Sequence, residues 1–326
     1  MGKKRVFVTR ILPGNVLEEI DEQVRFVNSP TGATLPNEVL LEKMRGVEGI
    51  ISTLSDRVDG PLMDRAGDSL EVISNYAVGF NNVDVDEATR RGVVVCNTPG
   101  VLTDATADMA FAMILSIARG IHRAHEFTEN GLFKGWEPDL FLGVPVFGGT
   151  LGIVGLGNIG KALARRAKGF EMNILYHNRK RVSPGIEKEL GAAYTSLDEL
   201  LGESDFVVLL VPLNEGTRGM IGEREIGLMK KDACLINISR GEVVKERALA
   251  KALAGKMIRG AALDVYEREP QIDPLLITLP NVLLLPHIGS ATEKARMEMA
   301  RLCVDNLMDV LRGDEPQASV NYSLVR

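Results

Sequence analysis

Short apolar segments alternate with helical patterns through almost the whole sequence, and this alternation restricts the fold more than any other feature. Most of these segments are apolar at every position rather than at every second one, which is typical of parallel strands covered by helices on both faces. The alternation predicts a doubly wound α/β fold. The predicted strands are residues 5–9, 49–53, 71–74, 93–96, 151–154, 174–176, 206–211, 233–238, 261–263 and 282–285.

Two longer helical patterns stand between the early strands and the later ones. The first is expected to run from Thr103 to about residue 129, and the second from about 291 to 311. A chain of 326 residues is also longer than one ordinary domain. We therefore expect one α/β domain, residues 101–286, inserted into another that consists of residues 1–100 and 287–326. The first long helix should carry one apolar face, made of Ala107, Ala110, Phe111, Ile114, Ala118 and Ile121.

Composition excludes several classes of partner. The net charge is −6 and the isoelectric point is near 5.5, so no extended nucleic-acid-binding face is expected. The three cysteines, Cys96, Cys234 and Cys303, form no CxxC or Cys/His cluster, which indicates a reducing compartment and no metal site. No apolar run is long enough to span a bilayer, and the N-terminus has no secretory signal pattern. The sequence thus predicts a cytoplasmic protein without membrane contact.

The segment "VGLGNIG" predicts a dinucleotide-binding turn. It places three glycines in a G-x-G-x-x-G pattern between the predicted strand 151–154 and an amphipathic helix, which is the context that this motif requires. Such a turn lets a diphosphate approach the backbone and offers it the free N–H groups of the helix N-terminus. The predicted contacts are Gly155, Leu156, Gly157, Asn158, Ile159 and Gly160.

A run of cations follows at the position that discriminates between the two nicotinamide dinucleotides. About 20 residues after the central glycine, an NAD-binding protein usually offers an acidic residue to the ribose. This sequence instead has His177, Asn178, Arg179 and Lys180 there. Because cations suit a 2′-phosphate and a carboxylate repels it, we expect NADP(H) to be preferred, with NAD(H) possible. Arg181 is expected to be solvated.

Three chemically complementary groups follow three later strands. Arg240 follows "CLINIS" and His287 follows "NVLLLP", while "AALDVYEREP" brings Asp264, Glu267 and Glu269 to a third strand end. In parallel α/β sheets, ligands bind beside the carboxyl ends of the strands. Cationic, acidic and imidazole groups at three strand ends beside a dinucleotide motif therefore predict a ligand-binding site at this edge of the sheet.

These segments together resemble the D-isomer-specific 2-hydroxyacid dehydrogenases. The resemblance rests on "VGLGNIG", "NISRGEVV", "LDVYEREP" and "PHIGSAT", and "NYAVGFNNVDVDEATRRGVVVCNTPG" is most similar to the glyoxylate/hydroxypyruvate reductase branch. It implies a Rossmann-type NAD(P)-binding domain inserted into a discontinuous flavodoxin-like substrate domain, and a homodimer. It also implies NADPH-dependent reduction of glyoxylate or hydroxypyruvate to D-2-hydroxy acids.

The resemblance further assigns roles to single residues. Arg240 would bind the substrate, His287 would be the acid and Glu269 its hydrogen-bond partner. A planar guanidinium suits the carboxylate and carbonyl of a 2-keto acid, histidine is a proton donor active near neutral pH, and a neighbouring carboxylate favours the imidazolium form. Backbone N–H groups at Val78 and Gly79 would hold the substrate carboxylate, and Asp264 would meet the nicotinamide carboxamide. The other implied cofactor contacts are Ile238, Ser239, His287 and Gly289. Trp136 is expected to be a core or interface anchor rather than a site residue.

Other activities remain open at this point. The same three residues occur in NAD-dependent phosphoglycerate dehydrogenases and are compatible with 2-ketogluconate reduction. A dinucleotide-sensing corepressor of the C-terminal-binding-protein kind would also keep them and would act through protein contacts.

Overall fold

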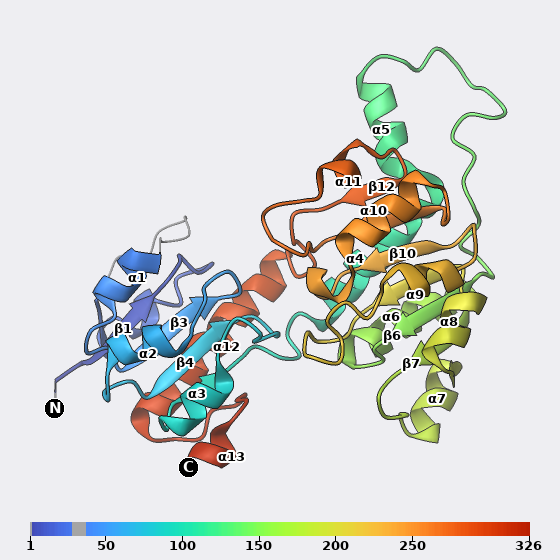
Figure 1. Ribbon diagram of the computed structural model, residues 1–326. Helices are drawn as coiled ribbons and strands as arrows, with labels where there is room; N and C mark the ends of the chain where they lie inside the picture. Colours follow the sequence, from blue (N-terminus) through green and yellow to red (C-terminus); the bar gives the residue numbers. More distant parts are fainter. Residues whose placement is uncertain (1, 28–36) are drawn as a thin grey trace. The chain divides into compact units, whose positions relative to one another are not determined.

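The computed structural model describes residues 2–27 and 37–326, and it divides into two compact units (Figure 1). Unit 1 consists of Met1–Leu102 and Ala291–Arg326, and unit 2 of Thr103–Ser290. Unit 1 contains a five-stranded sheet and unit 2 a seven-stranded sheet. All paired strands in both sheets are parallel. The predicted α/β fold class is confirmed.

The sheet of unit 1 has the strand order β2-β1-β3-β4-β5, which is the flavodoxin-like order of a doubly wound sheet. Its strands are β1 (Lys4–Val8), β2 (Val24–Phe26), β3 (Gly49–Thr53), β4 (Val72–Tyr76) and β5 (Val94–Cys96). Every residue of β3, β4 and β5 is buried. The helical elements are η1 (Glu18–Ile20), α1 (Asn37–Lys43), α2 (Gly60–Ala66), α3 (Val85–Arg90), α12 (Glu293–Arg312) and α13 (Tyr322–Val325).

Helices cover both faces of this sheet. Helix α12 packs against β3, β4 and β5, and the hydroxyl of Ser74 on β4 donates to the Cys303 carbonyl of α12 at 2.6 Å. The other face carries an apolar cluster that includes Phe7, Ile50 and Ile73 from the strands and Leu62 from α2. Burial on both faces explains why these strands are apolar without alternation.

The sheet of unit 2 has the order β12-β11-β10-β9-β6-β7-β8. The chain starts in the middle at β6, runs outward through β7 and β8, and then returns to β9 on the other side of β6, so the switch point lies between β6 and β9. The strands are β6 (Thr150–Val154), β7 (Asn173–His177), β8 (Ala192–Tyr194), β9 (Phe206–Leu209), β10 (Cys234–Asn237), β11 (Gly260–Leu263) and β12 (Val282–Leu284). The helical elements are α4 (Thr103–Arg119), α5 (Ile121–Glu129), α6 (Asn158–Lys168), α7 (Pro184–Leu190), α8 (Leu197–Glu203), α9 (Glu223–Leu228), η2 (Gly241–Val243), α10 (Glu246–Ala254) and α11 (Pro274–Thr278).

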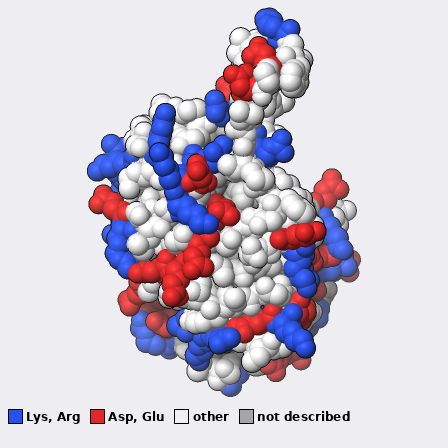
Figure 2. All heavy atoms as spheres, turned by 90° about the vertical axis from the view of Figure 1, so that its right-hand side faces the viewer, with Lys and Arg blue, Asp and Glu red and all other residues white. Residues whose placement is uncertain are grey.

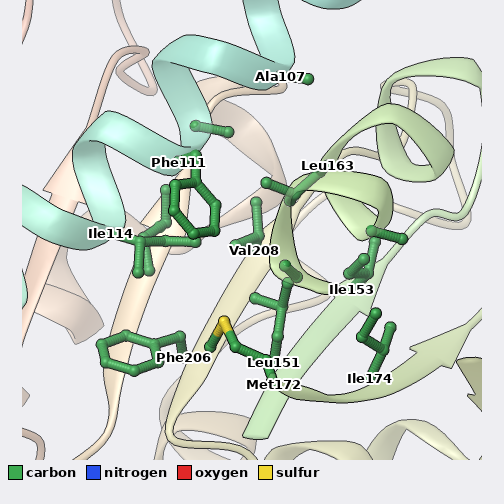
Figure 3. Packing of buried hydrophobic residues seen from close by; sticks show 14 of the residues in the cluster. Ala107, Phe111, Ile114, Leu151, Ile153, Leu163, Met172, Ile174, Phe206 and Val208 are labelled. Atoms are coloured by element: carbon green, nitrogen blue, oxygen red, sulfur yellow. The ribbon is translucent and has the colours of Figure 1, made fainter. Parts of the chain in front are cut away.

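The core of unit 2 consists of two apolar clusters. Figure 3 shows part of the first, in which Phe111 and Ile114 of α4 and Leu163 of α6 lie over side chains of β6, β7 and β9. The Phe111 ring lies 4.7 Å from that of Phe170 between the ring centres. The second cluster joins α8, α9 and α10 to side chains of β6, β9, β10 and β11 and includes Leu200, Ile226 and Leu249.

Two sequence expectations about the elements are wrong. Strands β2 and β8 were not predicted, because each has three residues and only its first is buried. The predicted single helix over 103–129 is two helices, α4 and α5, separated by Gly120 in the left-handed conformation at φ 62° and ψ 33°. Because of this break, Ile121 does not continue the apolar face of α4 and is 53% exposed.

Helix α5 and the segment after it extend away from the seven-stranded sheet (Figure 1). This arm, residues 121–148, carries Trp136, which is 83% exposed and therefore does not anchor the core of the chain. On the face in Figure 2, the arm forms the projecting lobe, and residues of both charges are interspersed over the face as a whole. The other exposed large apolar residues of the arm are Ile121, Leu132, Phe133, Leu142 and Phe147. Among the helices of residues 2–27 and 37–326, none has the length and apolar character needed to span a bilayer.

Candidate active site

The glycine turn joins β6 to α6 and leaves one of its three glycines open. Gly155 has φ 108°, and a Cβ there would lie 2.8 Å from the Leu210 backbone. A Cβ at Gly160 would lie 2.5 Å from the Gly155 carbonyl oxygen, so this glycine permits close packing of helix and strand. A Cβ at Gly157 would meet no atom within 4 Å. The first and third glycines thus serve the protein's own packing, whereas the second borders open space.

Gly157 is also the N-cap of α6 and offers no capping side chain. Within the described parts of the chain, the N–H groups of Asn158 and Ile159 have no acceptor. Uncapped N–H groups at a helix N-terminus favour an anion. The turn therefore fits a dinucleotide diphosphate.

The cation run lies beside this turn. Asn178 accepts a hydrogen bond from the Leu156 N–H through its side-chain oxygen at 2.6 Å, and this bond joins the loop after β7 to the glycine turn. The side chains of Arg179 and Lys180 are exposed and have no partner among the residues that the structure describes. Arg181, which was expected to be solvated, instead forms two hydrogen bonds to Glu187, at 2.7 and 2.8 Å.

Arg240 follows β10 on a turn organised by Asn237. The Asn237 side-chain oxygen accepts from the Ser239 hydroxyl at 2.8 Å, and its amide donates to the Arg240 carbonyl at 3.0 Å. Gly241 comes next, and a Cβ there would lie 1.8 Å from the Tyr266 backbone. Burial lowers the pKa of Arg240, and the charges of Glu269 and Glu242 oppose this shift.

His287 and Glu269 are hydrogen-bonded to each other. His287 Nδ1 lies 2.9 Å from Glu269 Oε2, and because a carboxylate only accepts, Nδ1 carries the proton. The second carboxylate oxygen accepts from the Tyr266 N–H at 3.1 Å. Burial would raise the pKa of Glu269, but the His287 hydrogen bond and charge, the Tyr266 N–H and Arg240 outweigh it and lower the pKa. His287 Nε2 forms no hydrogen bond within the described residues and is available to a ligand.

Asp264 holds the backbone beside His287. Its two oxygens accept from the N–H groups of Ile288 and Gly289, each at 2.7 Å. The side chain is almost fully buried, and this burial raises the Asp264 pKa despite the two N–H groups and the charge of His287. His287 itself has φ 57°, a left-handed conformation that side-chain-bearing residues seldom adopt. The aspartate thus fixes the loop that presents the imidazole.

Unit 1 has its own loop of available N–H groups after β4. The carbonyl of Val78 accepts from the Asn97 side chain at 2.8 Å, and the carbonyl of Gly79 accepts from the Asn75 side chain at 3.0 Å. Asn82 links the same loop to the carbonyls of Thr53 and Asp56. The N–H groups of Val78 and Gly79 have no acceptor in the described part of the chain.

The structure brings most of the predicted site residues of unit 2 to one edge of its sheet. Strands β10, β11 and β12 are neighbours, and Arg240, Asp264 with Glu269, and His287 follow their carboxyl ends in that order. Ile238 lies beside Gly289, since a Cβ on that glycine would be 3.2 Å from the Ile238 side chain. Sequence reasoning missed the hydrogen bonds of Asn237, Asp264 and Glu187. The asparagine three residues before a strand-end arginine is a signal that could have indicated the first of these.

Comparisons with known proteins agree with this geometry. Two-sheet α/β proteins with a glycine turn after the first strand of the larger sheet include the NAD(P)-dependent dehydrogenases. The family model for the D-isomer specific 2-hydroxyacid dehydrogenase NAD-binding domain matches residues 111–289, more than half of the chain. The chain belongs to the D-isomer specific 2-hydroxyacid dehydrogenase family.

Individual relatives match over their full length. A glyoxylate reductase from Thermococcus kodakarensis is 50% identical over 99% of this chain and 98% of its own. A glyoxylate reductase from Pyrococcus furiosus is 48% identical over 99% and 97%. Among solved structures, an NADPH-dependent glyoxylate/hydroxypyruvate reductase from Sinorhizobium meliloti, in complex with NADP and malonate, has a TM-score of 0.88. It is 34% identical to this chain, with 100% of this chain and 99% of the other covered.

Proposed function

We propose that this protein is an NADPH-dependent reductase that converts small 2-keto acids, glyoxylate and hydroxypyruvate in particular, to the corresponding D-2-hydroxy acids. The family supports the reaction class. The names of its Thermococcus and Pyrococcus relatives support glyoxylate, and the Sinorhizobium structure supports hydroxypyruvate and NADPH.

The residues of unit 2 fit a nicotinamide dinucleotide. Gly157 and the N–H groups of Asn158 and Ile159 would receive the diphosphate, and Arg179 and Lys180 the 2′-phosphate. Ile238, Ser239, Asp264 and Gly289, at the carboxyl ends of β10, β11 and β12, would border the nicotinamide end. When bound, this cofactor supplies the hydride that reduces the keto carbon.

The hydrogen bond between His287 and Glu269 carries the proposal. Hydride addition to a carbonyl leaves an alkoxide, which needs a proton. His287 holds a proton on Nδ1 by donating to Glu269, so a protonated imidazole can donate a second one from Nε2. Arg240 can pair with the carboxylate of a 2-keto acid and polarise its carbonyl through two planar N–H groups.

Unit 1 would contribute backbone donors. The N–H groups of Val78 and Gly79 are available to an anion, and the carbonyls of both residues are held by Asn97 and Asn75. We propose that they bind the substrate carboxylate, with unit 1 as the substrate-binding domain and unit 2 as the cofactor-binding domain. Held donors need no reordering when the anion arrives.

Assembly and location follow from surface and thiol chemistry. The exposed apolar residues of the arm support a homodimer in which a second copy covers them. The three cysteines are free and buried, which fits a reducing compartment, and we propose a cytoplasmic location.

The test is a turnover assay of the purified protein with glyoxylate, hydroxypyruvate, 3-phosphohydroxypyruvate and 2-ketogluconate, each with NADPH and NADH. We expect NADPH oxidation with the first two. His287→Ala should lower kcat about 10²- to 10⁴-fold while NADP⁺ binding survives. His125→Ala, an exposed histidine on α5, is the matched control and should behave as the unmutated protein. If no keto acid is reduced, the protein is a dinucleotide-binding module rather than this enzyme.

A further inference from the structure

The three consecutive cations after Asn178 have different surroundings. Arg179 and Lys180 extend into solvent, whereas Arg181 is paired with Glu187 through Nε and Nη2. The Glu187 side chain is only 11% exposed although Arg181 is 61% exposed. Arg181 also lies over the Tyr194 ring, with 5.8 Å between the guanidinium carbon and the ring centre. One cation is therefore committed to the protein while two are available.

Glu187 is held from a second side by a buried tyrosine of β7. The Tyr176 hydroxyl donates to Glu187 Oε1 at 2.6 Å and accepts from the Val182 N–H at 3.1 Å. The Tyr176 ring is fully buried in the sheet. Glu187 thus accepts hydrogen bonds from Arg181 and Tyr176 together, and it joins helix α7 to β7, the strand that precedes the loop.

These contacts fix both ends of a short loop. At its start, Asn178 accepts from the Leu156 N–H, and its carbonyl lies 3.4 Å from the Tyr194 hydroxyl. At its end, Arg181 is held by Glu187 and Val182 by Tyr176. Only Arg179 and Lys180 lie between the two fixed ends. Their backbone is therefore restrained before any ligand binds.

We propose that Glu187, acting through Arg181 and Tyr176, is a positioning residue for cofactor selection that holds Arg179 and Lys180 ready for the 2′-phosphate of NADPH. The inference rests on the proposed NADPH dependence. Restraint matters here because each loop residue or long side chain that must be ordered on binding weakens affinity. The Arg181 and Tyr176 hydrogen bonds lower the pKa of Glu187 to about 2, so the Glu187 side chain stays a carboxylate throughout the neutral range.

The experiment compares Glu187→Ala with Glu189→Ala, which removes the same charge from an exposed position of the same helix. We expect Glu187→Ala to raise KM for NADPH roughly threefold to tenfold, with kcat and the KM for NADH nearly unchanged. Glu189→Ala should leave all three near wild type. Tyr176→Phe keeps the ring and deletes the hydroxyl, and it should raise KM for NADPH by a smaller factor. Thermal unfolding of each variant reports whether the fold persists.

The opposite result is also informative. If Glu187 merely neutralised Arg181, its removal would add a free cation and KM for NADPH would fall. That outcome, or an unchanged KM, overturns the proposal. A double-mutant cycle separates the two residues. If Glu187 acts through Arg181, the double variant Glu187→Ala/Arg181→Ala should have the same KM for NADPH as each single variant. Additive increases in KM would instead make Arg181 a direct phosphate ligand and contradict the positioning role of Glu187.

Failure of the positioning role of Glu187 is distinguishable from failure of the proposed function. Wild-type kcat/KM values for NADPH and NADH test the cofactor preference without any variant. If wild type prefers NADPH and Arg179→Ala removes that preference while Glu187→Ala does not, only the positioning role is wrong.

Discussion

At the scale of single residues, the pair His287–Glu269 shows how a side chain and its backbone are set by different neighbours. Glu269 accepts the ring proton, and Asp264 accepts the two backbone N–H groups that follow His287. Residues that follow β11 therefore orient the imidazole, although His287 itself follows the neighbouring strand β12.

We expect Glu269→Gln to remain active but to have a lower kcat for keto-acid reduction than wild type at neutral pH. The pKa of Glu269 is lowered from its ordinary value of 4.5, so the group is a carboxylate at every working pH, and glutamine removes that charge throughout. Its contribution to stability is present above about pH 4.5 and is lost as the pH falls through the lowered folded-state pKa. Glutamine can still accept the His287 Nδ1 proton, but a neutral acceptor forms a weaker hydrogen bond than a carboxylate. The measurement is kcat for keto-acid reduction at neutral pH, and an unchanged value would contradict the pairing.

Arg179 gives a second prediction at this scale. Hydrogen bonds to charged groups contribute about 1.5–3 kcal/mol, so Arg179→Ala should raise KM for NADPH about 10- to 150-fold and leave NADH nearly unaffected. Lys180→Ala should have a smaller effect, because an exposed point charge is screened by salt. The measurement is kcat/KM with both cofactors. Equal losses with NADPH and NADH would show that Arg179 supports the fold rather than selects the cofactor.

At the scale of elements, the β6–turn–α6 unit separates packing from binding within one motif. A Cβ at Gly160 meets backbone at 2.5 Å, whereas a Cβ at Gly157 meets nothing. Overpacking of this kind typically costs about 1–3 kcal/mol. The two glycines therefore have different physical reasons to be glycine.

We expect Gly160→Ala to lower the thermal unfolding temperature of the cofactor-free protein. Gly157→Ala should leave that temperature nearly unchanged but weaken NADP⁺ binding at least tenfold, because the added methyl group would occupy the space of the diphosphate. Unfolding scans and calorimetric titration of both variants give the comparison. If Gly157→Ala bound NADP⁺ normally, the open space beside it would not be the diphosphate site.

At the scale of the whole molecule, the chain forms two compact units, each with its own parallel sheet and core. Unit 2 carries the arm, in which several large apolar side chains are exposed together. Single exposed apolar residues are ordinary, but a group of them on one segment marks an interaction surface.

We expect light scattering to report a mass of twice 35.5 kDa. The double variant Phe133→Ser/Trp136→Ser should shift the equilibrium toward monomer, because it removes two of the arm's exposed aromatic side chains. Met257→Ser, at an exposed apolar residue of unit 2 outside the arm, is the control and should remain dimeric. A wild-type monomer at micromolar concentration would refute the homodimer.

The sequence by itself determined the class of the fold, the glycine turn and the strand-end groups. Apolar runs such as Cys234–Asn237 are buried on both faces, so their composition reveals them. Because parallel strands end at one edge, placing Arg240, Glu269 and His287 after neighbouring strands was enough to predict that they gather there. Where a segment is three residues long and half-exposed, as in β2 and β8, composition carries no such signal.

The tertiary structure alone decided which polar groups pair. Asp264 binds the backbone 24 and 25 residues later, and Glu187 joins Tyr176 and Arg181 from a separate helix. Such pairs depend on how a loop and a helix fold back onto a strand, and they leave no periodic trace in the sequence. The break at Gly120 is similar, since glycine inside a helical pattern can continue the helix or end it. Which of these occurs depends on whether the packing that favours α4 extends beyond it, and here the exposed Ile121 shows that it does not.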